Sequence, residues 1–339
     1  MSWIKTFGYL LISILIYSLI SLLLSITPIF SNLIGYTFSN ETLLYLQQQY
    51  YFNAPMRSLI HGNAGCFLPD SDLGYKQIVG DCYFKNTEFD TVLKFNENGA
   101  VLNNHKKNKN APNIVVVGDS HAIGWGVNYN ETFSYLLSNF GYKVTNLSMS
   151  SYGTEQEVLA AINSEDFNNV DTIIIQYCNN DLSKNKINIS DYRDTEFKYY
   201  SNVEKNEFSL KSKLSNASKY YLKTFELIGF YSLPIKSMWN FFDASQKKNI
   251  DVLENSSIHK EFIINVLKKY KKELNNKNVI VFYSNGYGVK FTDWDSLESN
   301  FNFIDLNLDR SHYYVIDDHL NKSGHEYIAK KLINILSSL

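Results

Sequence analysis

The chain has 339 residues, which is enough for one large domain with appendages or for two domains. Its 32 basic and 34 acidic residues nearly balance, so we expect no nucleic-acid partner, because such partners select a basic surface. No two of its seven histidines have the spacing of a zinc motif such as His-Glu-x-x-His, which disfavours metal-dependent hydrolysis, and we expect no cofactor.

An apolar segment lies at the start of the chain. No residue from Phe7 to Phe30 is charged, and about 20 such residues cross a bilayer as a helix. Lys5 precedes the segment and no Lys or Arg follows it until Arg57, so the positive-inside rule places the rest of the chain outside the cytoplasm. A cleaved signal peptide is the alternative, but no clear cleavage site follows. We predict residues 1–30 as a cytoplasmic tip and single-pass transmembrane anchor in the inner (cytoplasmic) membrane.

Residues 31–110 follow as a linker and an N-terminal segment that contains two cysteines. Gly, Asn and Asp turn signals occur throughout residues 52–110, so we expect irregular structure there. Cys66 and Cys82 can pair in an oxidising compartment, and closing a loop of that length stabilises a protein by about 3 kcal/mol. The alternative is two unpaired, buried thiols.

Buried strands and helices alternate from Pro112 onward. The β-branched run Ile114–Val117 is typical of a strand that is buried on both faces. We expect strands at 114–117, 143–147, 171–176, 279–283 and 303–306, and helices at 131–140, 154–163, 258–274 and 322–336. Thr154 is the expected N-cap of the second helix, with Glu157 as its capping-box partner. This order predicts an α/β domain over residues 111–339, with a parallel sheet and helices on both faces.

Residues 183–257 interrupt this alternation as an insertion. Their 220–242 part is dense in aromatic residues. One interpretation is a helical subdomain that buries these rings in its own core. The other is a lid, or a surface for the membrane or for a partner protein.

Three short segments follow predicted strands, and open α/β sheets bind ligands beyond the carboxyl ends of their strands. Ser120, in Gly118-Asp119-Ser120-His121, is a candidate nucleophile if a base takes its proton. Gly153 precedes a helix, where a backbone N–H can bind an oxyanion. The side chain of Asn180, after the third strand, can donate to the same oxyanion. Taken singly, each segment also fits an ordinary turn, and for Gly153 by itself that is the better interpretation.

His319 is the preferred base among the histidines. It lies on a loop before the last helix, with Asp317 two residues earlier to fix its tautomer and Asp318 as the alternative acid. His121 adjoins the candidate nucleophile, and neighbouring side chains diverge, so it fits the role of base poorly. We expect His325, in the first turn of the last helix, to cap that helix or to face solvent.

Together these segments resemble the SGNH (GDSL-like) hydrolase superfamily, whose four named residues Ser, Gly, Asn and His occur in that chain order. Here they match Ser120, Gly153, Asn180 and His319. The resemblance covers about residues 112–182 and 278–338. It implies a flavodoxin-like sheet, with Ser120 as nucleophile and His319 as base. It also implies an oxyanion hole formed by the Ser120 backbone, Gly153 and Asn180.

Two positions depart from the pattern of that superfamily. Many members have Asp three residues before the His, where this chain has Ile316. A spacing of two residues resembles that of membrane-anchored relatives, so we choose Asp317 as the acid. Cys178 stands where the superfamily often has Gly, and beside an apolar strand we expect a buried, inert thiol. The segment with Cys66 and Cys82 also resembles the region that precedes this domain in bacterial anchored members.

We therefore predict a membrane-anchored serine esterase on the periplasmic or extracellular side. Its expected substrates are O-acyl groups, O-acetyl first, on a glycan or another envelope ester. One alternative is an O-acetyltransferase that modifies a cell-surface polysaccharide with a membrane-protein partner. The other is a non-catalytic component of an envelope complex that keeps the fold. The acyl group and the alcohol stay open, because variable loops shape the pockets of this fold.

Overall fold

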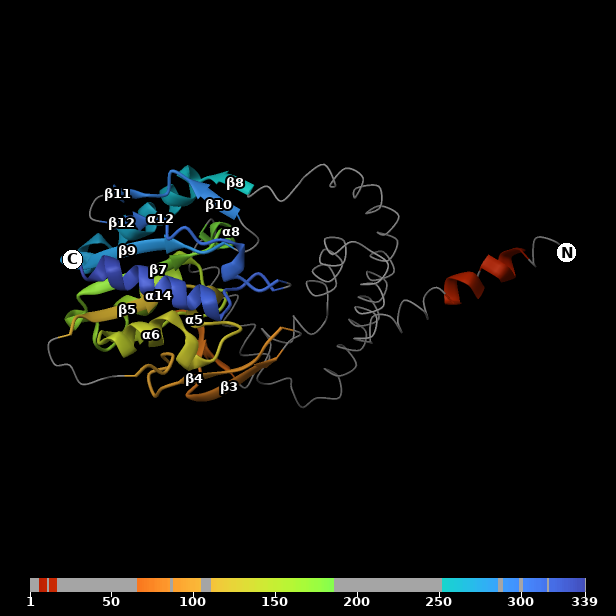
Figure 1. Ribbon diagram of the computed structural model, residues 1–339, viewed down its shortest axis with the longest axis horizontal. Coiled ribbons are helices and arrows are strands. Elements are labelled where there is room, and N and C mark those ends of the chain that lie inside the picture. Colours follow the sequence, from red (N-terminus) through yellow and green to blue (C-terminus); the bar gives the residue numbers. More distant parts are fainter. Residues whose placement is uncertain are drawn as a thin grey trace. The chain divides into compact units, whose positions relative to one another are not determined.

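The computed structural model describes residues 6–10, 12–16, 66–85, 88–104, 111–185, 252–285, 289–298, 301–315 and 317–338. The chain separates into two units, one of Met1–Ser58 and Asn206–Ile250 and the other of Leu59–Lys205 and Asp251–Leu339. Of the first unit, only residues 6–10 and 12–16 are described, and both stretches are helical (Figure 1).

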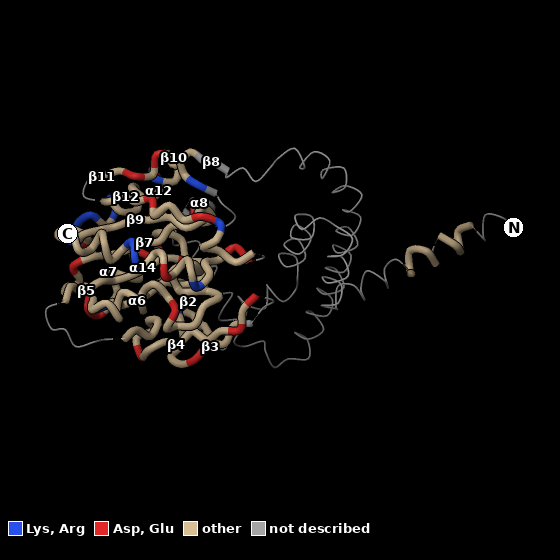
Figure 2. Tube along the Cα trace, viewed as in Figure 1, with Lys and Arg blue, Asp and Glu red and all other residues tan. Residues whose placement is uncertain are grey.

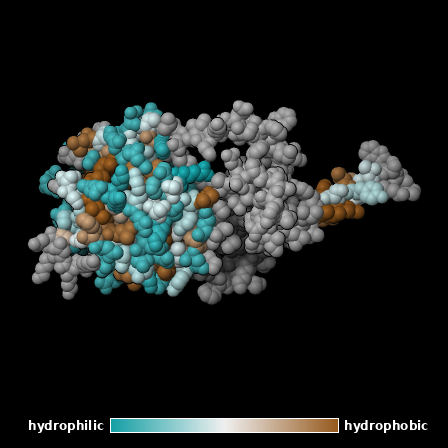
Figure 3. Space-filling view, viewed as in Figure 1, coloured by the Kyte–Doolittle hydropathy of each residue, from teal (hydrophilic) through white to brown (hydrophobic). Residues whose placement is uncertain are grey.

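Most of the expected anchor, Phe7–Phe30, lies outside the described residues. Its described part exposes large apolar side chains, including Phe7, Leu10 and Leu15. This stretch includes brown, hydrophobic residues in Figure 3. Within the described ranges, no helix combines the length and the apolar character needed to span a bilayer. The expected insertion at 183–257 also lies outside the described residues, apart from its two ends.

A six-stranded sheet forms the centre of the second unit (Figure 1). Its strands, in spatial order, are β11 (Ser296–Glu298), β12 (Phe301–Ile304), β9 (Asn278–Tyr283), β7 (Thr172–Tyr177), β5 (Asn113–Val117) and β6 (Lys143–Asn146). All neighbours pair in parallel except the edge strand β11, which is antiparallel to β12. The five parallel strands have the flavodoxin-like order that the sequence predicts.

Helices cover both faces of this sheet. They are α6 (Phe133–Phe140) and α14 (Lys322–Leu336) on one face, and α7 (Thr154–Ile162) and α12 (Ser257–Lys269) on the other. Successive residues of a strand point to opposite faces, so Ile114 and Val116 enter one core and Val115 and Val117 the other. Both cores are apolar, which explains the continuous β-branched run of β5. Acidic and basic residues are interspersed along this unit (Figure 2).

The expectation of irregular structure in residues 52–110 is wrong for their described part. Strand β1 (Phe67–Asp70) pairs with β2 (Gly74–Gln77), and β3 (Gly80–Lys85) pairs with β4 (Asp90–Phe95), both in antiparallel hairpins. The glycines read as loop signals are instead turn residues at strand starts: Gly74 and Gly80 have φ angles of 86° and 123°. We call the described residues between 66 and 104 the hairpin segment.

The hairpin segment shares a hydrophobic core with the α/β domain. Its Tyr75, Phe84 and Phe89 are buried with Trp125 and Tyr152 of that domain. A disulfide joins Cys66 to Cys82. The segment is therefore an integral part of the second unit, although its sequence has no clear helical or strand periodicity.

Helix α7 is capped differently from the sequence-based expectation. Gly153, not Thr154, is the N-cap, because Gly153 has an extended backbone and Thr154 is already helical. Gln156, not Glu157, closes the cap by accepting the N–H of Gly153 at 3.2 Å. The expected capping box was thus displaced by one residue, and Glu157 is left fully buried.

Other elements also differ from expectation. The helix expected at 258–274 is divided at Tyr270 into α12 and α13 (Lys271–Leu274). Strands β8 (Val252–Asn255) and β10 (Val289–Thr292) form a separate parallel pair that no pattern in the sequence had predicted. The other expected strands and helices of the domain are present, with ends that shift by one or two residues.

Candidate active site

The position of β5 in the sheet groups the three predicted strand-end segments at one edge. β5 lies between β6 and β7 and is parallel to both, so the chain leaves all three strands on the same side. Ser120 follows β5, Gly153 lies on the connection after β6, and Asn180 follows β7. Ligands of open α/β sheets bind at this edge.

Ser120 is the first residue of the short helix α5 (Ser120–Ile123), directly after the β5 strand. Asp119 caps this helix, and its Oδ1 accepts the N–H of His121 at 2.9 Å. Gly118 has no room for a side chain, because a Cβ there would lie 2.7 Å from the Cβ of Ala122 and from Oε1 of Gln176. The Gly-Asp-Ser sequence therefore fits a sharp strand-to-helix turn that fixes the position of the serine.

His319 connects Ser120 to Asp317. Its Nε2 lies 2.7 Å from Oγ of Ser120. Its Nδ1 contacts Oδ1 of Asp317, which also accepts the backbone N–H of His319 at 3.0 Å. When Nδ1–H donates to the carboxylate, Nε2 is the acceptor for the serine hydroxyl. The three side chains have the arrangement that activates a serine for attack on an acyl carbon.

Asp317 and Asp318, the two candidate acids, differ in burial and in their contacts with His319. Asp317 is fully buried and bonds His319 through both a ring nitrogen and the backbone. Oδ1 of Asp318 lies 3.4 Å from the same ring nitrogen, and its side chain is 30% exposed. The structure favours Asp317 as the orienting acid, and Asp318 contributes charge at a longer distance.

Burial and charge act in opposite directions on the two neighbouring imidazoles. Burial lowers the pKa of His319, but the charges of Asp317, Asp318 and Asp119 outweigh it, and the net pKa is raised. Burial lowers the pKa of His121 to about 4, and the charge of His319, whose ring lies 4.8 Å away, acts in the same direction. His319 is therefore the basic ring of the pair, and His121 is neutral at ordinary pH.

His325 does not cap α14 or face solvent, so that expectation is wrong. Its ring is fully buried, its Nδ1 accepts the N–H of Phe133 at 3.2 Å, and burial lowers its pKa to about 3. The N-cap of α14 is Asn321. A signal was available in the sequence, because His325 shares helical spacing with the buried Ile328 and Leu332.

The three predicted oxyanion donors differ in their hydrogen bonds and in their exposure. No described residue accepts the N–H of Ser120, which is at the start of α5. The N–H of Gly153 donates to Gln156, so an oxyanion would have to share or replace that bond. Asn180 is exposed in the turn before α8 (Asp181–Asn185). The roles of Gly153 and Asn180 in an oxyanion hole stay predictions.

Cys178, at the position where the superfamily often has Gly, is buried at the end of β7. Burial raises the pKa of its thiol well above the usual range, and negative charges including that of Asp119 add to the shift. Its backbone N–H donates to Oδ2 of Asp181 at 3.0 Å. A thiol that stays protonated is a poor nucleophile, which agrees with a structural role for Cys178.

Asp317, Asp318 and His319 are also the one group of ionisable residues in the described ranges that is close enough to hold a metal ion. The hydrogen bonds of His319 to Asp317 and Ser120 already use both ring nitrogens. These bonds account for the cluster without an ion.

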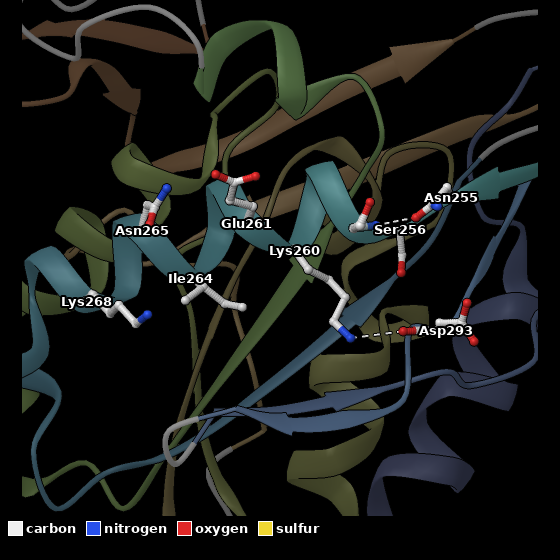
Figure 4. Close-up of a pocket in the computed structure, with 9 residues that line it drawn as sticks. Asn255, Ser256, Lys260, Glu261, Ile264, Asn265, Lys268 and Asp293 are labelled. Atoms are coloured by element: carbon white, nitrogen blue, oxygen red, sulfur yellow. Dashed lines mark hydrogen bonds between the residues drawn. The ribbon is translucent and has the colours of Figure 1, made fainter.

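A surface pocket lies along α12 (Figure 4). It is lined by Asn255, Ser256, Ser257, Lys260, Glu261, Ile264, Asn265, Lys268 and Asp293. Nζ of Lys260 donates to the backbone oxygen of Asp293 at 2.9 Å across it. None of the residues predicted for catalysis lines this pocket, and we assign it no role.

Comparison with protein families agrees with this geometry. Residues 114–332 match the model of the GDSL-like lipase/acylhydrolase family. The chain belongs to this family. The matched range contains Ser120, Asp317 and His319 and covers more than half of the chain.

Comparison with curated proteins finds no match. Among solved structures, the chain is similar to the salicylyl-acyltransferase SsfX3 from a tetracycline biosynthetic pathway, with 14% sequence identity and a TM-score of 0.28. The similarity covers 69% of this chain and 57% of that one, so the chain spans less than two thirds of that structure.

Proposed function

We propose that this enzyme is a serine esterase in which Ser120, His319 and Asp317 form the catalytic triad. One observation carries the proposal: a single imidazole contacts the serine hydroxyl with one nitrogen and a buried carboxylate with the other. Ser120 Oγ attacks the ester carbonyl while His319 Nε2 takes its proton. The charge of Asp317 stabilises the imidazolium that forms.

The reaction then passes through an acyl-enzyme on Ser120. The imidazolium of His319 gives its proton to the departing alcohol oxygen as the tetrahedral intermediate collapses. Water, or the hydroxyl of an acceptor, attacks the acyl-enzyme while His319 again takes the proton. The N–H of Ser120 is the first candidate to bind the oxyanion, with Gly153 and Asn180 as the further donors. Losing one such donor costs about 10²–10³ in turnover.

We propose O-acyl groups, O-acetyl first, on a glycan or another envelope ester as the substrate class, with the catalytic unit outside the cytoplasm. Two features support this location. The sequence from Phe7 to Phe30 is uncharged and long enough for a membrane anchor. Cys66 and Cys82 form a disulfide, and disulfides persist mainly in oxidising compartments.

Labelling with a fluorophosphonate serine probe tests the nucleophile. We expect the wild-type protein to be labelled and Ser120→Ala to remain unlabelled. Ser148→Ala is the matched control, because Ser148 is buried nearby and no described residue bonds its hydroxyl. Equal labelling of wild type and Ser120→Ala would remove Ser120 as the nucleophile.

Turnover of a small p-nitrophenyl ester separates catalysis from the non-catalytic alternative. Activity that disappears in His319→Ala excludes a purely structural component. Hydrolysis and transfer are then separated with an acyl donor, in the presence and absence of a glycan acceptor. Hydrolysis that the acceptor leaves unchanged counts against an O-acetyltransferase.

A further inference from the structure

Glu88 contacts the loop of the candidate triad from a distant part of the chain. It lies on the hairpin segment just before β4, more than two hundred residues before Asp317. Its Oε1 accepts the N–H of Val315 at 2.8 Å, and its Oε2 accepts the N–H of Asp317 at 2.6 Å. Both carboxylate oxygens are therefore used on one short stretch of backbone. Hydrogen bonds to an ionised acceptor are stronger than those between neutral groups.

The loop that carries Asp317 and His319 begins at Tyr313 and ends at Leu320. At its base, Tyr313 and Leu320 form a β-bridge, and the N–H of Tyr314 donates to the backbone oxygen of His319 at 3.0 Å. Nearer the tip, the side chain of Val315 is 56% exposed, so apolar burial contributes little there. The two bonds from Glu88 act directly on the backbone N–H groups of Val315 and Asp317, beyond this base.

The rest of the hairpin segment supports this placement. The ring of Phe89 lies 5.3 Å from that of Tyr314 and 6.1 Å from that of Trp125, and Trp125 lies 5.8 Å from the ring of His319. The hydroxyl of Tyr314 donates to the backbone oxygen of Gly126 at 2.5 Å. Glu88 is therefore held against the loop by a packed aromatic group and not by its own side chain alone.

We propose that Glu88 is a positioning residue of the active site, which holds the backbone at Val315 and Asp317 so that the Asp317 carboxylate meets Nδ1 of His319. Glu88 contacts neither His319 nor Ser120 by any hydrogen bond that the structure records, and acts through the loop. The inference rests on the proposed triad. It extends that proposal to a segment outside residues 114–332, the span of the family match.

The chemistry of the contact suggests a graded set of variants. Glu88→Gln keeps the size of the side chain but replaces one acceptor oxygen with an NH₂ group that faces a backbone N–H. Glu88→Asp keeps both acceptor oxygens on a shorter stem. The matched control is Asp81→Asn, which removes a carboxylate from the same hairpin, where Asp81 pairs with Lys94 at 2.9 Å and not with the loop.

The experiment compares these variants of the full chain in ester turnover across pH. For Glu88→Gln we expect kcat to fall on the order of 100-fold with KM nearly unchanged, the loss that a misplacement of about 1 Å causes. We also expect the acidic limb of kcat/KM to move to lower pH, because His319 loses the nearby charge of Asp317. Glu88→Asp should recover part of both effects, and Asp81→Asn should behave as wild type.

A purely structural role for Glu88 predicts a different result. It would lower the melting temperature and the amount of active protein without moving the acidic limb, and that outcome overturns the inference, as does wild-type kcat in Glu88→Gln. If Glu88→Gln does not fold, kcat and the position of the acidic limb are measured in Glu88→Asp instead, and they decide in the same way.

A third measurement distinguishes failure of this inference from failure of the proposed function. The NMR titration of the His319 ring reports its contact with Asp317 without any substrate. A wild-type protein that the serine probe does not label contradicts the proposed function. An unchanged His319 titration in Glu88→Gln contradicts the positioning role while leaving the triad intact.

Discussion

The turn that carries Ser120 and the loop that carries Asp317 and His319 differ in where their support comes from. Asp119 caps the helix that Ser120 begins, and Gly118 packs against Ala122, four residues away. By contrast, the loop of Asp317 is contacted by Glu88 and Phe89, both on the hairpin segment far away in the sequence.

This difference has a consequence for stability and activity. The turn of Ser120 is also bonded to a neighbouring strand, since the N–H of Asp119 donates to Oε1 of Gln176 at 3.1 Å, so it keeps its shape as long as the central sheet and α5 are folded. A loop that is stabilised by a separate segment depends on the folding of that segment as well. We expect changes in the hairpin segment to affect the contact between Asp317 and His319 before they affect Ser120.

The largest expected effect is at the acid itself. Asp317→Asn should lower kcat by about 10⁴, because an amide at this position favours the wrong tautomer of His319. Asp318→Asn is the matched control, since it removes a neighbouring carboxylate that is partly exposed and lies 3.4 Å from the ring. Steady-state ester hydrolysis measures both. A loss as large in Asp318→Asn as in Asp317→Asn would reverse the assignment of the acid.

The pH dependence of activity should reflect His319 alone. The base must be neutral to take a proton, and the pKa of His319 is raised because the charges of Asp317, Asp318 and Asp119 outweigh burial. A raised pKa keeps the ring protonated over a wider range, so the acidic limb of kcat/KM should lie above the usual range of histidine. Burial lowers the pKa of His121 to about 4, so this ring should not contribute.

The control for that profile is Asp318→Asn, which removes one of the charges that raise the pKa of His319. Its acidic limb should lie at lower pH than that of wild type, with little loss at the plateau. A wild-type limb at or below the ordinary pKa of histidine, about 6.5, would contradict the raised pKa.

The nucleophile side could be predicted because its signals are local. The run Ile114–Val117 is β-branched and apolar at every position, which is typical of a strand buried on both faces, and the Gly-Asp-Ser turn follows it at once. The flavodoxin-like order and the GDSL-like family were both predictable from such short blocks. Whether Gly153 and Asn180 complete an oxyanion hole is still a prediction.

The support of the acid loop could not be predicted, because it depends on pairs of residues that are distant in the chain. Nothing near Glu88 in the sequence indicates that its carboxylate meets the backbone of residues 315–317. The hairpins that place it were also missed, since strands of four to six residues between turn signals are too short for a clear two-residue period.

A smaller effect should follow from opening the disulfide of the hairpin segment. The double variant Cys66→Ser/Cys82→Ser should lower the free energy of unfolding by about 3 kcal/mol, the chain-entropy value for a loop with a sequence separation of 16. Urea unfolding measures it. A reducing agent should lower the stability of wild type to that of the double variant and leave the variant unchanged. Equal stability of oxidised wild type and double variant would mean that the bond does not constrain the segment.

The smallest expected effect has the opposite sign and concerns the nucleophile side. Glu157 is fully buried, and neither of its carboxylate oxygens has a hydrogen-bond partner in the described part of the chain. Burial raises its pKa well above the usual value, and the charges of Asp181 and Asp119 raise it further, against the opposing charge of Lys184. An ionised carboxylate at this position therefore destabilises the fold, and Glu157→Gln should stabilise it at neutral pH by about 1 kcal/mol.

The sign of this effect with pH identifies its cause. A group whose pKa is raised by folding favours the folded state below its unfolded pKa, about 4.3 for Glu, and this contribution is lost as the pH rises through the folded pKa. The advantage of Glu157→Gln should thus be present at pH 7 and absent near pH 4, with kcat close to that of wild type at pH 7. Urea unfolding at the two pH values measures it. A loss of stability at pH 7 would mean that the Glu157 carboxylate has a stabilising partner.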